Sequence, residues 1–475
     1  MSKFNAFLDR KFKLGEKGTS VKTEVMAGLT TFMAMVYILM VNAGMFAELG
    51  TVSYGAMYIV TALSAIIGTV LIGLLSGLPL AQAPGMGLNA FFVYTICFGF
   101  GFSYANALVF VLIDGLVFIA LTVTGLREKI FKAIPEDIKK AIPAGIGLFI
   151  AFIGLQNVDL VVSLESTGVT MGSMNLLLTD WVNIIPLIVV ILGVFAIAVM
   201  FKKNVKGSIL WGILGSAVLY YAIVGVSALF GNEACKAIFD SVSFANPFTA
   251  FKEFGTQAVG QVFVEGFNFS GWIEANGAGQ FILVLVTSSL AFCLVDMFDT
   301  LGTLYGACKS GDLLDKNGDI PNLNQAMMAD AVATTAGAIL GTSTVTTFVE
   351  SSAGTAVGGK TALTSYVVAG LFAVAMFLSP IAQLIPSCAT ATALIYVGVL
   401  MMNNVREIEW TDPAVALPAF LTIAMMPFTY NISFGIGFGL LAHVAIKVFT
   451  GKAKEISVAT YVLTAIFLAM FLFTH

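Results

Sequence analysis

Apolar runs of about 17–25 residues recur along the whole chain, and short polar or charged stretches separate them. Each run is long enough to cross roughly 30 Å of hydrocarbon as a helix. We therefore expect membrane spans at residues 25–47, 54–76, 103–125, 138–158, 182–201, 207–230, 279–305, 327–341, 362–379, 386–402, 414–430 and 432–449. Two shorter segments, at 80–98 and 342–359, are interrupted by glycine, and with them the expected total is fourteen.

The composition agrees with a membrane protein. Of the 475 residues, 58% are hydrophobic and only 11% are charged, whereas soluble domains carry roughly 25% charged residues. Residues 1–24 are polar and basic, unlike a cleavable signal peptide. The five cysteines show no paired spacing, and the chain has only two histidines. We therefore expect no disulfide framework, no metal site, no cofactor, no nucleic-acid partner and no histidine-based catalytic dyad.

The basic residues indicate the orientation in the membrane, because Lys and Arg are concentrated in cytoplasmic loops. One side receives the N-terminal residues 1–24 together with Arg127, Lys129, Lys132, Lys139, Lys140, Lys202, Lys203, Lys206, Lys309, Lys316, Arg406, Lys452 and Lys454. The opposite side receives the more acidic loop 231–278. We therefore expect a cytoplasmic N-terminus. Whether residues 456–473 of the apolar tail 450–475 cross the membrane is left open.

The two halves of the chain repeat each other. Ile142-Pro143 opens one expected span and Ile385-Pro386 opens another, and each of these spans ends in a polar Asn-containing stretch. Each half contains seven expected spans, an odd number, so the second copy must enter the membrane from the opposite side. Inverted repeats of this kind are typical of secondary transporters. The sequence therefore predicts an all-α polytopic membrane protein with a seven-plus-seven inverted repeat.

The third and tenth segments are broken. In the third, residues 80–83 run into Pro84 and a glycine-rich stretch; in the tenth, the β-branched run 344–347 leads to Glu350. Both patterns indicate a short strand followed by a half-helix. Unpaired backbone groups cost several kcal/mol each in the bilayer core, so we expect the two strands to pair with each other. The half-helix N-termini would then face a central cavity. The alternative is two ordinary helices kinked by glycine.

Three acids lie in these apolar surroundings: Asp296, Asp299 and Glu350. A carboxylate at mid-membrane costs roughly 2.5–3.5 kcal/mol on insertion scales, so such residues are usually functional. Asp296 and Asp299 are three residues apart and share one helix face, where both can line a cavity. We expect a polar site for a proton, an ion or a small molecule. The alternative is that all three lie at helix ends.

Other residues near these segments have weaker signals. Asp114 lies within the span 103–125 and is either a proton relay or a structural partner of a helix break. Asp330 lies close to the start of its expected span, so we expect it at the membrane interface. Phe348 and Phe91 flank the breaks and could stack on a planar ligand.

Four stretches of the chain carry a resemblance to a known family. They are Gly28-Leu29-Thr30-Thr31-Phe32-Met33-Ala34-Met35-Val36-Tyr37-Ile38, Ala83-Pro84-Gly85-Met86-Gly87-Leu88-Asn89-Ala90, Asp296-Met297-Phe298-Asp299-Thr300 and Thr346-Thr347-Phe348-Val349-Glu350-Ser351-Ser352-Ala353-Gly354. With them the chain resembles bacterial purine permeases of the nucleobase–cation symporter superfamily, in the azaguanine-resistance branch. The resemblance extends over residues 15–450.

The resemblance implies a division of the spans into two domains. A core domain would contain residues 25–125 and 279–379, and a gate domain would contain residues 138–230 and 386–449. The purine would sit between them at the two broken segments. The cytoplasmic N-terminus 1–24, the loop 231–278 and the tail 450–475 lie outside both domains.

The resemblance also implies roles for individual residues. Asn89, Asp296 and Glu350 match positions that the family uses for purine binding, and Gly87 and Asp299 match positions associated with transport. Asp299, Asp296 and Glu350 are the candidates for proton coupling. The related uracil permeases carry a glutamate and a histidine on the eighth span. This chain has no histidine there, so that proton mechanism cannot be carried over intact.

The chemistry of these residues suits a purine. The carboxylates of Glu350 and Asp296 can accept the ring N–H donors, and Asn89 with the half-helix N–H groups can serve the ring acceptors. We therefore expect proton-coupled uptake of hypoxanthine, guanine or adenine by a multi-pass protein of the plasma membrane that is not an enzyme. Sodium coupling and the oligomeric state, a homodimer included, are left open.

Two other functions are less consistent with these residues. An anion transporter of the same architecture would need a cation or an unopposed half-helix dipole, and Glu350 beside the second half-helix argues against it. An intramembrane aspartyl protease needs two facing aspartates on different helices, whereas Asp296 and Asp299 lie on one.

Overall fold

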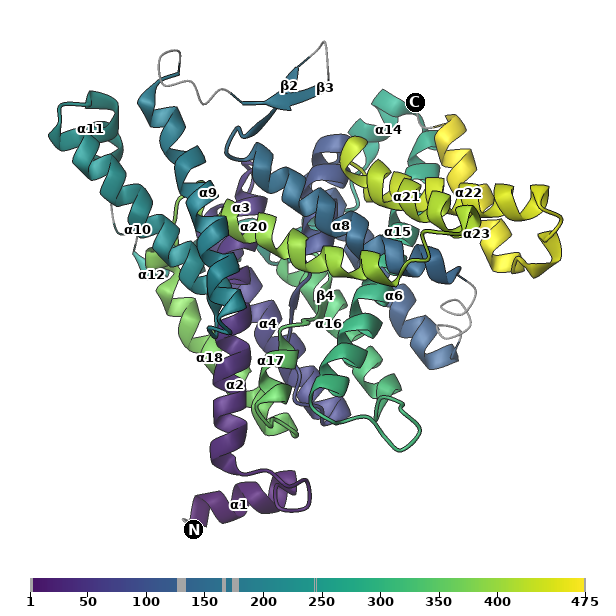
Figure 1. Ribbon diagram of the computed structural model, residues 1–475, viewed down its shortest axis with the longest axis horizontal. Coiled ribbons are helices and arrows are strands. Elements are labelled where there is room, and N and C mark those ends of the chain that lie inside the picture. Colours follow the sequence, from purple (N-terminus) through teal and green to yellow (C-terminus); the bar gives the residue numbers. More distant parts are fainter. Residues whose placement is uncertain are drawn as a thin grey trace.

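The computed structural model describes residues 3–125, 134–164, 168–172, 179–242, 244 and 246–473. Within them, ten helices are long and apolar enough to cross a membrane. The other expected spans are the two broken segments, the shorter helix Pro413–Phe428 and the helix Leu323–Leu340. The expected cytoplasmic residues Arg127, Lys129 and Lys132, and the second histidine, His475, lie outside the described residues. The all-α membrane architecture is confirmed (Figure 1).

The first half of the chain contains these elements: α1 (Lys3–Phe12), α2 (Val21–Met35), α3 (Ile38–Ala47), α4 (Tyr54–Ser76), β1 (Gln82–Pro84), α5 (Met86–Ala90), the π-helix η1 (Phe91–Gly99), α6 (Tyr104–Thr124), α8 (Glu136–Gln156), β2 (Val161–Leu164), β3 (Gly168–Met171), α9 (Trp181–Lys202) and α10 (Ser208–Leu229). Short helices then follow: α11 (Glu233–Asp240), α12 (Pro247–Glu253), η2 (Phe254–Ala258), α13 (Gln261–Val264) and α14 (Ser270–Asn276). The expected loop 231–278 is therefore largely helical.

The second half contains α15 (Ala278–Ser310), α16 (Leu323–Leu340), β4 (Val345–Thr347), α17 (Ser351–Ala356), α18 (Ala362–Ala375), η3 (Met376–Leu378), α19 (Ser379–Ala382), α20 (Ser387–Met401), η4 (Met402–Glu407), α21 (Pro413–Phe428), α22 (Ile432–Phe449), η5 (Ala453–Glu455) and α23 (Val458–Phe473). The apolar tail thus forms one more helix, α23, which packs against α22 and α15.

The two broken segments meet in the middle of the molecule. β1 and β4 pair antiparallel, with Gln82 opposite Thr347 and Pro84 opposite Val345. The pairing continues at both ends, because the Gly85 N–H donates to the Thr344 carbonyl at 3.0 Å and the Phe348 N–H to the Ala81 carbonyl at 3.0 Å. The strand residues are all buried. Two short strands that satisfy each other's backbone groups were predicted, and the alternative of two glycine-kinked helices is wrong.

The helices pack in two groups around this pair. In the first group, α4 packs against α3, α16 and α18, α2 against α17 and α18, α6 against α15, α16 and η1, and η1 against α5. In the second group, α8 packs against α20 and α21, α9 against α10 and α20, and α21 against α22. α8 contains Ile142-Pro143, and α20 begins directly after Ile385-Pro386. The two helices approach so closely that a Cβ on Gly398 would clash with the Gly147 carbonyl oxygen. Small residues are what allow membrane helices to approach in this way.

The expected interfacial position of Asp330 is wrong. α16 begins at Leu323, earlier than the expected boundary, so Asp330 lies near the middle of the helix and is fully buried. Its Oδ1 accepts hydrogen bonds from Thr300 Oγ1 at 2.9 Å and from Gln82 Nε2 at 3.3 Å. Asp330 therefore connects α16 with α15 and with strand β1.

Candidate functional site

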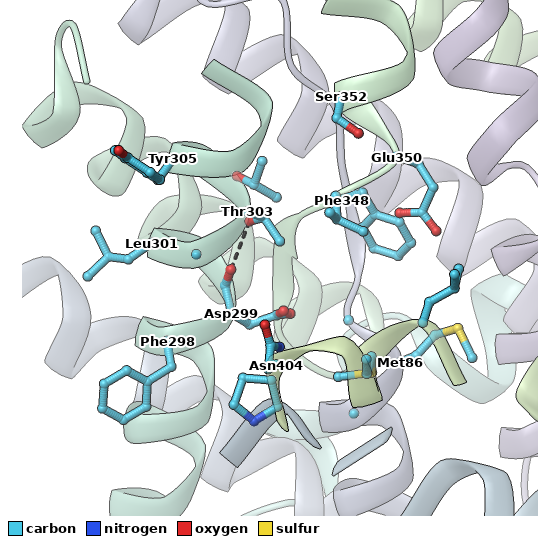
Figure 2. A pocket seen from close by; sticks show the side chains of 18 of the residues that line it. Met86, Phe298, Asp299, Leu301, Thr303, Tyr305, Phe348, Glu350, Ser352 and Asn404 are labelled. Atoms are coloured by element: carbon cyan, nitrogen blue, oxygen red, sulfur yellow. Dashed lines mark hydrogen bonds between the residues drawn. The ribbon is translucent and has the colours of Figure 1, made fainter. Parts of the chain in front are cut away.

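A cavity of about 1260 Å³ lies beside the paired strands, between the two helix groups (Figure 2). The first group contributes the segments 85–87 from the third span, 298–305 from α15 and 347–353 from the tenth span. The second group contributes the start of α8 and the ends of α9 and α20. Cavities that hold small polar ligands are typically apolar with a few convergent polar groups, and this lining has that character.

Glu350 and Asp299 both contribute carboxyl groups to the cavity wall. Figure 2 shows them with the ring of Phe348 between them in that view. Glu350 precedes the half-helix α17 at its N-cap position. Asp299 lies on α15, where its Oδ2 accepts a hydrogen bond from Thr346 Oγ1 of strand β4 at 3.2 Å. The Thr346 bond holds this part of α15 to the strand. The Asp299 carbonyl also accepts from Thr303 Oγ1 at 2.8 Å, a bond within α15.

Tyr37 is a residue of this site that our sequence analysis did not single out. Its hydroxyl donates a hydrogen bond to Glu350 Oε1 at 2.6 Å, and its ring is almost fully buried. The expected first span is in fact two helices, because α2 ends at Met35 and α3 begins at Ile38. The available signal was the hydroxyl itself, since a tyrosine in the middle of an apolar span needs a hydrogen-bond partner.

The two aspartates of the motif are placed differently from our expectation. We expected Asp296 to face the substrate, but the described lining of the cavity includes Asp299 and not Asp296, which is fully buried. Asn89 is also absent from that lining. Its Nδ2 donates to the Pro84 carbonyl at 3.3 Å and its Oδ1 accepts from Ser343 Oγ. In this conformation Asn89 therefore holds strand β1 to the segment before β4.

Some of the remaining candidate residues line the cavity and others do not. Phe348 and Gly87 line it. Phe91 does not serve as a ligand platform here, because it is fully buried with its ring centroid 4.7 Å from that of Phe292. Asp114 is fully buried on α6, and both interpretations of it remain predictions.

The cavity lining reaches the basic loops, where its residues Glu136, Asn204 and Lys206 are exposed, so the cavity has its mouth at this end. Lys139 and Lys140 also line it. Lys206 Nζ also donates to Thr30 Oγ1 of α2 at 3.4 Å, which places this mouth on the side of the N-terminal segment. At the opposite end, the side chain of Glu48 is held by hydrogen bonds from Tyr94 and Asn157.

Comparisons with known proteins agree with this architecture. A family model described as a permease family matches residues 22–438. The guanine/hypoxanthine permease PbuO of Bacillus subtilis is 37% identical over 460 residues, which cover 96% of this chain and 98% of the relative. The adenine permease AdeQ of Escherichia coli is 34% identical over 461 residues, which cover 97% of this chain and 95% of the relative.

Among solved structures, the transmembrane domain of a cyanobacterium bicarbonate transporter, BicA, matches with a TM-score of 0.58. The match covers 89% of this chain and 97% of the BicA domain at 16% identity, so it shows the fold alone. That fold is the inverted-repeat membrane architecture that the sequence predicts.

Proposed function

Because the chain belongs to the permease family, and is therefore a multi-pass plasma-membrane transporter and not an enzyme, we propose that it imports purine nucleobases by proton symport. Two full-length relatives named as permeases of guanine and hypoxanthine, and of adenine, support the substrate class. We propose hypoxanthine or guanine as the first substrates to test, with adenine next.

The observation that carries the proposal is the position of Glu350 on the cavity wall. A purine presents ring N–H donors and a flat apolar face. The Glu350 carboxylate accepts such a donor, and Phe348 beside it offers an aromatic face for stacking. An anion would be repelled by the same carboxylate, so the alternative of an anion transporter is supported only by its shared fold.

Proton coupling is proposed from the pair of acids. Asp299 and Glu350 face one cavity, and two carboxyl groups in poorly hydrated surroundings repel each other when both are ionised. A proton that enters with the purine removes this repulsion. Asp296, buried one turn behind Asp299, is proposed as a second proton-coupling residue. We propose that Asn89 supports purine binding through its hold on strand β1.

We propose that transport occurs by movement of a core domain, residues 25–125 and 279–379, against a gate domain, residues 138–230 and 386–449. The two helix groups support this division, since most of the extensive helix packing lies within each group. With the N-terminus in the cytoplasm, the cavity of this structure opens inward. Exchange of conformation between the two inverted halves would open it outward.

The test uses purified protein in liposomes that hold an imposed pH gradient. Labelled hypoxanthine should accumulate when the outside is acidic, and an uncoupler should abolish the accumulation. Excess unlabelled guanine or adenine should compete, whereas bicarbonate and uracil should not. Accumulation that needs a sodium gradient and ignores the proton gradient would contradict symport with protons. Absence of purine uptake under every gradient would overturn the substrate class.

A further inference from the structure

Tyr37 enters the cavity wall at the break between α2 and α3. Only Val36 and Tyr37 separate the two helices, and both keep right-handed helical backbone angles, so the ring projects from a local irregularity within one span. The hydroxyl lies 2.6 Å from Glu350 Oε1, a length typical of a hydroxyl that donates to an ionised carboxylate. Tyr37 belongs to the first span and Glu350 to the tenth, so this bond joins two inverted halves of the repeat.

We propose that Tyr37 is a positioning residue for purine recognition, a role that rests on the proposed function. A carboxylate can rotate, and each of its two oxygens can accept a hydrogen bond. With Oε1 held by Tyr37, the Glu350 carboxylate is fixed in one orientation, in which we propose that Oε2 accepts the purine N–H. A pre-oriented acceptor binds more tightly because less freedom is lost on binding.

The test removes only the hydroxyl, in Tyr37→Phe. The Kd of hypoxanthine on purified protein and the KM of uptake should both rise about tenfold, with little change in kcat, as expected for the loss of one supporting hydrogen bond. Tyr58→Phe is the matched control. Tyr58 is also buried in the first half, and its hydroxyl donates to the Ala375 carbonyl at 3.0 Å, away from the cavity. That variant should leave the Kd unchanged.

A double-variant cycle separates positioning from a merely structural role. If Tyr37 acts through Glu350, then Tyr37→Phe should have no further effect on the Kd in a Glu350→Gln background. An unchanged Kd in Tyr37→Phe, or an equal loss in both backgrounds, would overturn the inference. Failure of the wild-type protein to bind hypoxanthine would instead overturn the proposed function, so the two failures are distinguishable.

A second inference comes from a different part of the molecule, the end opposite the cavity mouth. Glu48 follows α3, and its carboxylate accepts hydrogen bonds from the Tyr94 hydroxyl at 2.8 Å and from Asn157 Nδ2 at 3.2 Å. Tyr94 is on η1, in the first helix group, whereas Asn157 ends α8 in the second group. The carboxylate therefore joins the two groups.

Tyr430, in the connection between α21 and α22, adds two more contacts between the groups. Its backbone carbonyl accepts from Thr95 Oγ1 at 3.1 Å, and its ring lies edge-on to that of Tyr94 with the centroids 5.9 Å apart. The Tyr430 hydroxyl donates to Gln156 Oε1 at 2.8 Å, which fixes the side chain on the second group.

We infer that Glu48, Tyr94, Thr95, Asn157 and Tyr430 form a latch that keeps this end closed while the cavity is open at the other. The inference rests on the proposed movement of core against gate, in which this end must open once in every cycle. The latch joins the two groups through two hydrogen bonds and one ring contact. Water can replace each hydrogen bond when the two groups separate, which makes repeated opening and closing inexpensive.

The test of the latch is a reversible crosslink, Glu48→Cys with Asn157→Cys. The side-chain tips of the native pair are 3.2 Å apart, and the five native cysteines are buried. Because cysteine is shorter than either native side chain, the two thiols are joined with a short bis-methanethiosulfonate reagent. The reagent should stop hypoxanthine uptake and reduction should restore it, whereas each single variant should be insensitive to the reagent. Undiminished uptake with the crosslink fully formed would overturn the latch. Absence of uptake by the wild-type protein would count against the proposed function instead.

A second variant, Asn157→Asp, tests the latch if the double-cysteine variant is inactive even without its crosslink. Asn157→Asp places a second carboxylate against Glu48 and should favour the open state. Thr95→Cys serves as the reporter, because Thr95 is only 1% exposed in the closed state. A membrane-impermeant maleimide should label Cys at position 95 at least tenfold faster when Asn157→Asp is also present. Equal labelling rates would contradict the latch.

Discussion

Gly87 on α5 and Ile146 on α8 lie so close that a Cβ atom on residue 87 would be 2.5 Å from Ile146 Cγ2. α5 is the half-helix of the third span, and α8 belongs to the other helix group. The absence of a side chain at Gly87 therefore allows the half-helix to lie close to α8. In our proposal, the half-helix moves along this surface of α8 during transport.

Gly87→Ala should impair transport by steric overlap with Ile146. Overpacking of this kind costs about 1–3 kcal/mol, so we expect the uptake rate to fall by about one to two orders of magnitude while the protein remains in the membrane. Ile146→Ala removes the clashing Cγ2 atom and should restore part of the activity in the double variant. No recovery in the double variant would show that Gly87 acts in another way.

Glu350→Gln should weaken purine binding more than any other single change in the cavity. Loss of a hydrogen bond to a charged group costs roughly 1.5–3 kcal/mol, which is about one to two decades in affinity. Equilibrium binding of labelled hypoxanthine to purified protein measures the effect, with the elution profile as the check on folding. Binding equal to that of the wild-type protein would remove Glu350 from the site.

Asp299→Asn should uncouple transport from the proton gradient. Asp299 lines the cavity and keeps its Thr346 contact as an amide of the same shape, so purine binding should fall less than in Glu350→Gln. Accumulation against a gradient should be lost, whereas exchange of labelled for unlabelled purine should persist. Asp296→Asn, at the fully buried second residue proposed for proton coupling, should also reduce accumulation. Loss of binding in Asp299→Asn with normal coupling would reverse the assignment.

The features that depend on local chemistry could be predicted from the sequence. The pairing of β1 with β4 follows from a proline, a β-branched run and the need to satisfy backbone groups in the bilayer. A carboxylate within an apolar span is usually functional. Of the three acids that the sequence singles out for this reason, Glu350 and Asp299 line the cavity and Asp296 does not.

The features that depend on distant contacts could not be predicted. Tyr37 and Glu350 are 313 residues apart, and nothing local identifies them as a pair. The burial of Asp330 depends on Gln82 and Thr300, which reach it from two other elements. That Asp299 rather than Asp296 lines this cavity could not be predicted either, because a shared helix face does not specify which end of that face meets the open space.

Glu24 anchors the first span to the start of α18, and Glu24→Ala should destabilise the protein. Its fully buried carboxylate accepts hydrogen bonds from the backbone N–H groups of Lys360, Thr361 and Thr364 and from Thr364 Oγ1. Hydrogen bonds to a charged group contribute about 1.5–3 kcal/mol each, so the loss should lower the Tm in detergent by several degrees. Glu16→Ala is the control, because the Glu16 side chain is 73% exposed beside Lys13. Equal melting temperatures of the wild-type protein and Glu24→Ala would show that the hydrogen bonds to Glu24 contribute nothing to stability.

Closure of the latch should depend on pH through Glu48. Glu48 is partly open to solvent, but desolvation of its carboxyl still raises the pKa, and hydrogen bonds from Tyr94 and Asn157 oppose that rise only in part. In the open state the carboxyl would be hydrated, with a pKa nearer its ordinary value. The closed latch therefore binds the proton more tightly. The stability that this proton adds to the closed latch is fully present below the ordinary carboxyl pKa. It is lost as the pH rises through the raised pKa of the closed state.

The latch should accordingly open more readily as the pH on that side rises from the ordinary carboxyl range toward neutrality. Burial raises the pKa of the neighbouring Tyr430 to about 12, so this phenol stays neutral throughout that window. The measurement is the rate of maleimide labelling of Thr95→Cys at each pH. Dividing this rate by the rate for the same cysteine in a Glu48→Gln background removes the pH dependence of the thiol itself. The ratio should increase with pH, because glutamine cannot ionise. A ratio that is flat with pH would show that Glu48 holds the latch without sensing protons.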